Sequence, residues 1–301
     1  SVDTNTPNWF QTVSHKIGQR MLTIPNYVDP NVFFPSPRKH DGKIRIVYPR
    51  RLYEARGLYI TLAVVAKILK KFPQAEFHFV GKGFEEDVKQ IRKAMERWPG
   101  RIYCYHRDPD DMHQVYKDAD IVLIPTLYSE GTSLSCLEAC ATGNAIIATR
   151  IGGLTDIIID RFNGLLINPD SKSLEKAIME CMENPELREK LGKNALEVSK
   201  AFNKAAWKER WKAVIKEMLH QNGYSVKQNA KIPTTETIEF RLGPKTKREE
   251  WMPEAVKCLK QGMAVFIRGD REMEPESSFG RIQWISDDAE LYFEPAIKRF
   301  D

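Results

Sequence analysis

The sequence lacks the residue patterns that mark several common classes of protein. Its 301 residues include only five cysteines, and their spacing matches neither a disulfide framework nor a zinc site. No apolar run is long enough for a transmembrane segment, and no signal peptide is recognisable. We therefore expect a protein of the reducing cytoplasm without a transmembrane segment.

The sequence also lacks a block of charge of one sign, because its net charge of +5 is spread along the chain. No nucleic-acid-binding motif is present, so we expect no nucleic-acid partner. Diffuse positive charge is compatible with an anionic substrate or with peripheral attachment at the inner membrane face, although a solvated basic surface is the simpler explanation. The hydrophobic fraction of 42% is ordinary for a globular protein, and the length suits one large or two medium domains.

Strand-like and helix-like segments alternate over residues 24–222. This alternation predicts βαβ units, and therefore an α/β fold with a doubly wound, Rossmann-like parallel sheet and helices on both faces. The expected strands lie at 44–48, 77–80, 102–105, 120–124, 145–148 and 164–167. The expected helices lie at 58–71, 84–98, 111–117, around 134–141, and at 153–159, 171–183, 185–201 and 204–219.

The pattern changes after Gly223. Residues 223–301 predict a small α+β extension whose function the sequence does not assign. Its expected strands lie at 237–242, 264–268, 280–285 and 290–293, and its one expected helix at 249–261.

The most informative segment runs from Tyr128 to Pro169 and begins just after a strand that Pro125 ends. Residues 130–133 form a turn, and Thr132 or Ser133 is expected to cap the following helix. Such a helix directs unpaired N–H groups and the positive end of its dipole at the carboxyl end of the strand, which makes an anion site where open α/β sheets bind ligands. Gly131 allows the backbone to come close to a ligand.

Two carboxylates accompany this anion site, because Glu130 and Glu138 lie eight positions apart across the junction of loop and helix. A carboxylate is out of place beside a phosphate alone, but it accepts hydrogen bonds from sugar hydroxyls. The segment therefore predicts a site for a diphosphate attached to polyhydroxylated groups. The alternative is a solvated loop glutamate and an ordinary helix glutamate.

This segment resembles the donor-nucleotide half of GT-B glycosyltransferases, most closely the large retaining family 4, also called group 1. Residues 22–29, with the sequence LTIPNYVD, look like the IPNGVD segment that leads into the second Rossmann-like domain of the family. The resemblance implies that Glu130 contacts the donor sugar and that Glu138 contacts the ribose. The further donor-binding residues that it implies are Gly131, Thr132, Ser133 and Leu134.

Two arginines follow the first strand of the expected sheet. The family commonly has an Arg here and a Lys-Gly pair a few residues later; Arg51 fits the Arg, and Arg56-Gly57 takes the Lys-Gly place. The resemblance gives Arg51 and Arg56, with Glu130, the catalytic roles, since two cations would hold the diphosphate and stabilise it as it leaves. Arg brings a planar fork where Lys brings a point charge. The alternative is a pair of surface arginines.

Two further features have weaker support. Residues 105–109 lie where the family places its base-binding loop, so His106 or Arg107 is expected to stack on or hydrogen-bond the base, the alternative being a surface histidine. Gly152-Gly153 and Asp156 match a GGxxE segment with Asp for Glu, and we give Asp156 no catalytic role. Residues 108–111 indicate a turn before a helix, in preference to metal ligands.

The resemblance implies metal-independent transfer of a hexose, with retention, from a nucleoside diphosphate sugar to the hydroxyl of a sugar, polysaccharide or lipid-linked acceptor. It implies no cofactor. Residues 1–23 are expected to be a remnant of a preceding domain or a linker, with the acceptor-binding N-terminal domain separate or missing. The alternatives are a noncatalytic sugar-nucleotide-binding module or donor subunit of a two-chain transferase, and a bare doubly wound domain for another nucleotide.

Overall fold

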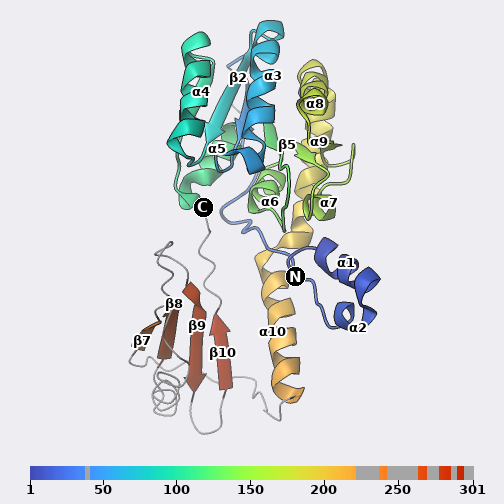
Figure 1. Ribbon diagram of the computed structural model, residues 1–301, viewed down its shortest axis with the longest axis vertical. Helices are drawn as coiled ribbons and strands as arrows, with labels where there is room; N and C mark the ends of the chain where they lie inside the picture. Colours follow the sequence, from blue (N-terminus) through green and yellow to red (C-terminus); the bar gives the residue numbers. More distant parts are fainter. Residues whose placement is uncertain (38–40, 222–236, 243–263, 270–277, 286–289, 295–301) are drawn as a thin grey trace. The chain divides into compact units, whose positions relative to one another are not determined.

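The computed structural model describes residues 1–37, 41–221, 237–242, 264–269, 278–285 and 290–294 (Figure 1). The chain divides into two compact units, Ser1–Arg210 and Trp211–Asp301. Helix α10 (Lys204–Gln221) contains the boundary between them. Among the described residues, none of the helices combines the length and the apolar character that a bilayer crossing requires.

The first unit is built on a parallel sheet of six strands in the order β3-β2-β1-β4-β5-β6, which confirms the predicted α/β fold with a Rossmann-like sheet. The order reverses between β1 and β4, because β2 and β3 lie on one side of β1 and the later strands on the other. In open α/β sheets this reversal marks the crevice where ligands bind. The strands are β1 (Ile44–Tyr48), β2 (Ala75–Val80), β3 (Ile102–Tyr105), β4 (Ile121–Ile124), β5 (Ala145–Thr149) and β6 (Leu165–Ile167).

Helices cover both faces of this sheet (Figure 1). Successive strand residues point to opposite faces, so Ile46 and Tyr48 belong to one apolar core and Val47 to the other. Burial on both sides explains why the central strand β4 is apolar along its whole length. The helices on the first face are α3 (Leu58–Lys71), α4 (Glu85–Arg97) and α8 (Ser171–Glu183). Those on the second are α5 (Met112–Asp118), α6 (Leu134–Ala141) and α7 (Leu154–Ile157), while α9 (Pro185–Ser199) contributes to both cores.

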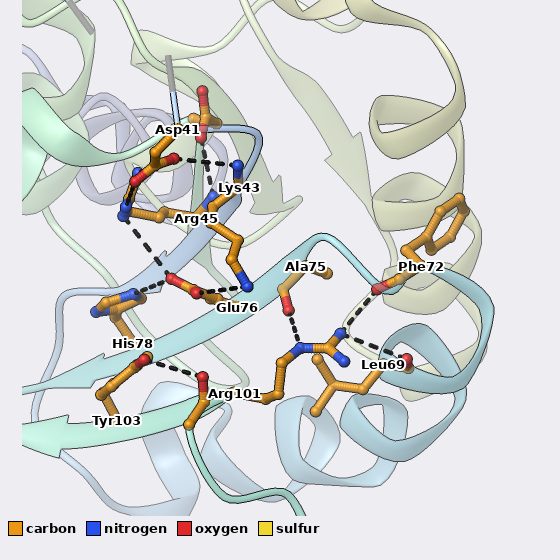
Figure 2. A network of polar contacts seen from close by, with 12 residues as sticks. Asp41, Lys43, Arg45, Leu69, Phe72, Ala75, Glu76, His78, Arg101 and Tyr103 are labelled. Atoms are coloured by element: carbon orange, nitrogen blue, oxygen red, sulfur yellow. Dashed lines mark hydrogen bonds and ion pairs between the residues drawn. The ribbon is translucent and has the colours of Figure 1, made fainter. Parts of the chain in front are cut away.

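Both ends of α3 have a physical cause. Gly57 precedes the helix at a φ of 87°, a left-handed conformation that favours glycine, and a Cβ there would lie 2.0 Å from the carbonyl oxygen of Pro125. At the other end, the Arg101 guanidinium donates to the carbonyls of Phe72 at 2.8 Å and Leu69 at 3.4 Å (Figure 2). The carbonyl groups at the end of a helix have no intrahelical donors, and here the Arg101 guanidinium donates to them.

A second polar network lies toward the amino ends of β1 and β2, away from the edge at which β1 and β4 end (Figure 2). The buried Glu76 carboxylate lies 3.3 Å from Lys43 Nζ, 3.8 Å from Arg45 Nε and 3.7 Å from His78 Nε2. Burial lowers the pKa of His78, against the opposing effect of Glu76. These contacts compensate the cost of burying the Glu76 carboxylate and link β1 to β2.

Two segments differ from the helices that the sequence predicts. The helix expected at 153–159 is shorter, because α7 ends at Ile157 and Ile158 is extended. Asn163 causes this ending: its side chain donates to the Ile157 carbonyl at 2.9 Å and accepts from the Ile159 N–H at 2.7 Å. Residues 1–23, for which no element is predicted, contain α1 (Asn5–Val13) and α2 (His15–Gly18).

The second unit contains a four-stranded mixed sheet in the order β10-β9-β8-β7. Strands β7 (Thr237–Leu242) and β8 (Ala264–Gly269) are parallel, and β9 (Ser278–Ile285) and β10 (Glu290–Glu294) continue the sheet in antiparallel pairs. The four strands lie where the sequence predicts them. The helix expected at 249–261 lies outside the described residues.

Candidate functional site

The candidate site lies at the carboxyl edge of the sheet, where the neighbouring strands β1 and β4 end. Arg50 follows β1 and Glu130 follows β4. The Arg50 Nη2 atom lies 2.5 Å from Glu130 Oε2, and Arg56 Nη1 lies 2.7 Å from the same oxygen. The hydroxyl of Thr126 also donates to Oε2, at 2.9 Å. One carboxylate oxygen therefore receives three donors, and the two guanidinium groups leave the cluster with one excess positive charge.

The structure brings Arg50 to Glu130, and it leaves the neighbouring Arg51 exposed. Sequence reasoning missed Arg50, although a weak signal was present. Arg50 follows Tyr48 by two positions, and in extended backbone such residues share a face of the sheet. Burial raises the pKa of the Tyr48 phenol well above its usual range, so its hydroxyl stays a donor. It donates to the carbonyls of Arg51 at 3.2 Å and Arg56 at 2.9 Å and thereby fixes the loop that carries Arg56.

The backbone of Glu130 is fixed by the Gly152-Gly153 turn. The Gly153 N–H donates to the Glu130 carbonyl at 2.8 Å. A Cβ on Gly152 would lie 2.1 Å from that carbonyl oxygen, and one on Gly153 would lie 2.4 Å from the Gly131 oxygen. The two glycines therefore allow a backbone approach that no larger residue permits, and this approach determines where the Glu130 side chain starts.

Helix α6 begins directly beside this cluster. Of the two candidate caps, Ser133 performs the capping, because its hydroxyl accepts from the Cys136 N–H at 3.4 Å. The N–H groups of Leu134 and Ser135 lie in the first turn, where no intrahelical acceptor exists, so this end of α6 favours an anion. The Ser135 hydroxyl donates to the Pro49 carbonyl at 3.1 Å and joins the helix to the loop after β1.

Thr132 has a different role from the predicted cap. Its hydroxyl donates to the Val2 carbonyl and accepts from the Asn26 N–H at 3.2 Å, while the Asn26 amide donates to the Thr132 carbonyl at 3.0 Å. Thr132 thus connects the turn before α6 to two segments of the N-terminal region. The IPNYVD sequence, whose Asn is Asn26, is held at the site by this contact.

Glu138 lies one helical turn after Leu134 on α6 and is only 5% exposed. Burying a carboxylate costs free energy unless polar partners compensate it. Its burial argues against an ordinary solvent-facing helix glutamate. The predicted contact between Glu138 and a ribose stays a prediction.

Residues 1–4 pack beside the turn that carries Glu130, which the sequence did not indicate. The N–H of Thr4 donates to Asp156 Oδ2 at 2.8 Å, and the Thr4 hydroxyl donates to Asp156 Oδ1. Val2 lies against Gly131, where a Cβ would meet the Val2 Cγ2 atom at 2.8 Å. Asp156 therefore holds the N-terminal segment against the turn that carries Glu130.

His106 and Arg107 follow β3, at the same carboxyl edge but two strands away from β1. His106 Nε2 lies 3.5 Å from Asp108 Oδ1, and the Arg107 guanidinium lies over the Tyr105 ring, 5.5 Å from its centre. The structure does not bring these two residues to the cluster around Glu130. Their predicted contact with a base remains a prediction.

The two cysteines of α6 lie in the apolar core of the second face of the sheet. Cys136 and Cys140 are both buried, in agreement with the packing role predicted for them. A hydrogen bond with Cys136, together with burial, holds the pKa of the Cys140 thiol well above its ordinary value. A protonated thiol is a poor nucleophile, so Cys140 serves packing.

A doubly wound parallel sheet with helices on both faces defines a Rossmann-like domain, and at its switch point the N-terminus of α6 lies beside the ion pairs of Glu130 with Arg50 and Arg56. Residues 31–198 match the sequence model of the family described as glycosyl transferases group 1. The chain therefore belongs to the group 1 glycosyltransferase family.

Individual relatives agree with this assignment. A D-inositol 3-phosphate glycosyltransferase from Corynebacterium kroppenstedtii is 28% identical over 170 residues, which cover 54% of this chain and 38% of that protein. This chain thus spans about two fifths of the length of that relative.

Solved structures show the same fold. The C-terminal domain of a glycosyl transferase group 1 family protein (LpcC) from Francisella tularensis superposes with a TM-score of 0.53 at 24% identity, covering 58% of this chain and 97% of that domain. Anabaena Alr3699/HepE, solved in complex with UDP-glucose, gives a TM-score of 0.63 at 19% identity over 72% of this chain and 63% of that one.

Proposed function

We propose that the first unit binds a nucleoside diphosphate sugar at the carboxyl edge between β1 and β4. We further propose that the protein transfers a hexose from this donor to an acceptor hydroxyl, with retention and without a metal ion. The observation that carries the proposal is the cluster of Arg50, Glu130 and Arg56 beside the N-terminus of α6.

The charges of this cluster suit a diphosphate. Two guanidinium groups and one carboxylate sum to one positive charge, and the end of the α6 dipole adds to it. Guanidinium groups bind phosphate oxygens through charge-assisted, two-pronged hydrogen bonds. The same groups stabilise the charge that develops on the diphosphate as the bond to the sugar breaks, which is the main chemical demand of the transfer.

The carboxylates suit the polyhydroxylated parts of the donor. Glu130 is anchored through Oε2, so its other oxygen, Oε1, is the proposed acceptor for a sugar hydroxyl. Glu138 is the proposed acceptor for the ribose hydroxyls. These contacts orient the Glu130 carboxylate before the donor binds, which reduces the cost of ordering it on binding.

The comparisons support the class of donor. The Anabaena neighbour was solved with UDP-glucose, and the curated relative is named as a glycosyltransferase. The acceptor that we propose is a sugar, polysaccharide or lipid-linked hydroxyl compound. A cytoplasmic location, expected from the cysteines, is part of the same proposal.

Calorimetry in the presence of EDTA tests donor binding. The titrants are UDP, GDP and ADP, their glucose or mannose derivatives, and ATP as a plain nucleotide. We expect one nucleoside diphosphate sugar to bind at least as tightly as its own diphosphate. Binding only after Mg²⁺ is added would contradict metal independence, and tighter binding of ATP than of every sugar nucleotide would favour a domain for another nucleotide.

A second candidate is a donor-binding module that transfers no sugar by itself. It is favoured by the match to an isolated C-terminal domain, of which 97% is covered. Incubation with the donor that binds best and a panel of acceptors distinguishes the two candidates. Transfer by this chain supports the enzyme, and proton NMR of the product then reports whether the anomeric configuration is retained. Binding without transfer supports the module.

A further inference from the structure

The Arg50 side chain has one amino group that Glu130 does not use. This side chain is only 6% exposed, and its Nη2 atom holds Glu130. Its Nη1 atom is buried and has no hydrogen-bond acceptor in the part of the chain that the structure describes. A buried donor without an acceptor costs free energy, more so when the group is charged, so it indicates a position at which a ligand completes the structure.

The position of Arg50 is held firmly from both sides. The Ser135 hydroxyl at the start of α6 binds the Pro49 carbonyl at 3.1 Å, directly before Arg50. After β2, Gly81 passes so close that a Cβ there would lie 2.1 Å from the Arg50 carbonyl oxygen. The side chain therefore starts from a rigid point beside the N-terminus of α6.

The two arginines at Glu130 differ in their freedom to move. The Arg56 side chain is 29% exposed and its Nη1 atom also contacts the Ser129 carbonyl at 3.2 Å. A ligand phosphate can draw Arg56 from Glu130 toward solvent at little cost, because this guanidinium is already partly hydrated. Buried Arg50 has no such route, so it keeps its contact with Glu130 when Arg56 turns to the ligand.

We propose that Arg50 is a positioning residue of the donor site that makes two separate contacts. Its Nη2 atom holds Glu130, and its Nη1 atom donates to the diphosphate of the nucleoside diphosphate sugar. This inference rests on the proposed function. It assigns the fixed cation of the site to Arg50 and the exchangeable one to Arg56. Glu130 is then kept in place for the sugar at the moment when Arg56 turns to the phosphate.

Two substitutions distinguish the contact of Arg50 with Glu130 from its proposed contact with the diphosphate. Lys has one amino group, so Arg50→Lys retains the charge and one contact with Glu130 but cannot serve the phosphate as well. Arg50→Met retains much of the apolar stem and loses both contacts. The matched control is Arg92→Met on α4, where the arginine side chain is 59% exposed and pairs with an exposed glutamate, Glu85.

The experiment is a calorimetric titration of the full chain with UDP, GDP or ADP, whichever the unsubstituted chain binds best, and with its hexose derivative. For Arg50→Lys we expect affinity for the diphosphate to fall roughly 10- to 100-fold, while the ratio of sugar-form to diphosphate affinity stays unchanged. For Arg50→Met we expect the same fall and a loss of that ratio, because Glu130 is no longer held. Arg92→Met should bind as the unsubstituted chain does.

The binding results of the two Arg50 variants show whether Nη1 contacts the diphosphate. If Arg50→Lys binds the diphosphate normally and Arg50→Met does not, Nη1 makes no contact and the inference is overturned. Normal binding by Arg50→Met overturns it completely. If Arg50→Met fails to fold, Arg50→Lys alone still tests the phosphate contact. If the unsubstituted chain binds none of the three diphosphates or their sugar forms, the proposed function fails first, and the two failures are thus distinguishable.

Discussion

The backbone of Gly152 lies so close to the Glu130 carbonyl that position 152 has no room for a Cβ atom. A Cβ on Gly152 would stand 2.1 Å from the Glu130 carbonyl oxygen, and Gly152 also has a φ of 51°. The turn between β5 and α7 thereby acts as a support for the residue at the centre of the candidate site. The position of the Glu130 carboxylate depends on a backbone contact far from it in the sequence.

Replacing Gly152 with alanine should therefore impair both stability and donor binding. Gly100→Ala is the matched control, because Gly100 has a φ of 71° but nothing within 4 Å of its Cβ position. The left-handed conformation alone costs about 1–2 kcal/mol, which is the loss expected for Gly100→Ala. Gly152→Ala should lose more in urea unfolding and should bind the donor less tightly. Equal losses for the two variants would show that the close contact relaxes without consequence.

Replacing Glu130 with glutamine should have opposite effects on the two forms of the ligand. The carboxylate partly neutralises Arg50 and Arg56, so its removal raises the positive charge facing the diphosphate. We expect the plain diphosphate to bind at least as tightly as before, with a steeper dependence on salt. The preference for the sugar form should disappear, because a hydroxyl loses its charged acceptor. Calorimetry at two salt concentrations measures both effects, and weaker binding of the plain diphosphate would contradict this assignment.

The two arginines that the family resemblance indicates should differ in importance. Arg56→Ala removes a guanidinium that touches Glu130, and we expect a loss of about 10-fold or more in diphosphate affinity, as for a hydrogen bond between charged groups. Arg51→Ala should reduce affinity less, because Arg51 is exposed and its charge is screened. Arg56→Lys should be the mildest change, since it keeps the charge. A larger effect at Arg51 than at Arg56 would return the main phosphate contact to Arg51.

Replacing Glu138 with glutamine should weaken the plain diphosphate and the sugar form to the same extent, because the ribose belongs to both. The loss of a hydrogen bond to a charged group is worth about 1.5–3 kcal/mol, or roughly 10- to 150-fold in affinity. Comparison with Glu130→Gln is informative, since only that variant should change the ratio of the two affinities. Unchanged affinities for Glu138→Gln would restrict this buried glutamate to a structural role in α6.

Alkaline pH should destabilise the protein through its buried thiols. Burial raises the pKa of Cys181 from 9.0 to about 12. The folded state therefore holds this proton where the unfolded state releases it, so stability is retained below pH 9 and falls as the pH rises toward 12. One such group contributes a slope of up to about 1.4 kcal/mol per pH unit. Urea unfolding between pH 8 and 10.5 should show a shallower slope for Cys181→Ala than for the unsubstituted chain, and identical slopes would rule out this origin.

Much of the fold could be predicted because its signals are local. Apolar runs such as Ile121–Ile124 and the helical spacing of Leu58–Lys71 depend on neighbours within one element, and the structure has both as predicted. Glu130 was recognisable for the same reason, since it follows a strand and precedes a capped helix. The shortened α7 was missed because Asn163, which ends it, acts through side-chain hydrogen bonds to residues beyond the periodic pattern.

The sequence by itself determined the succession of strands and helices along the chain and the capped start of α6 just after Glu130, and it predicted a ligand at that edge of the sheet. Only the tertiary structure decided that Arg50 faces Glu130, that Asp156 holds Thr4, and that Thr132 joins the N-terminal segment. The physical reason is that periodicity reports which face a residue occupies within its own element. Which side chains meet across 80 or more positions depends on how close two loops come, and here glycine contacts and backbone hydrogen bonds set that distance.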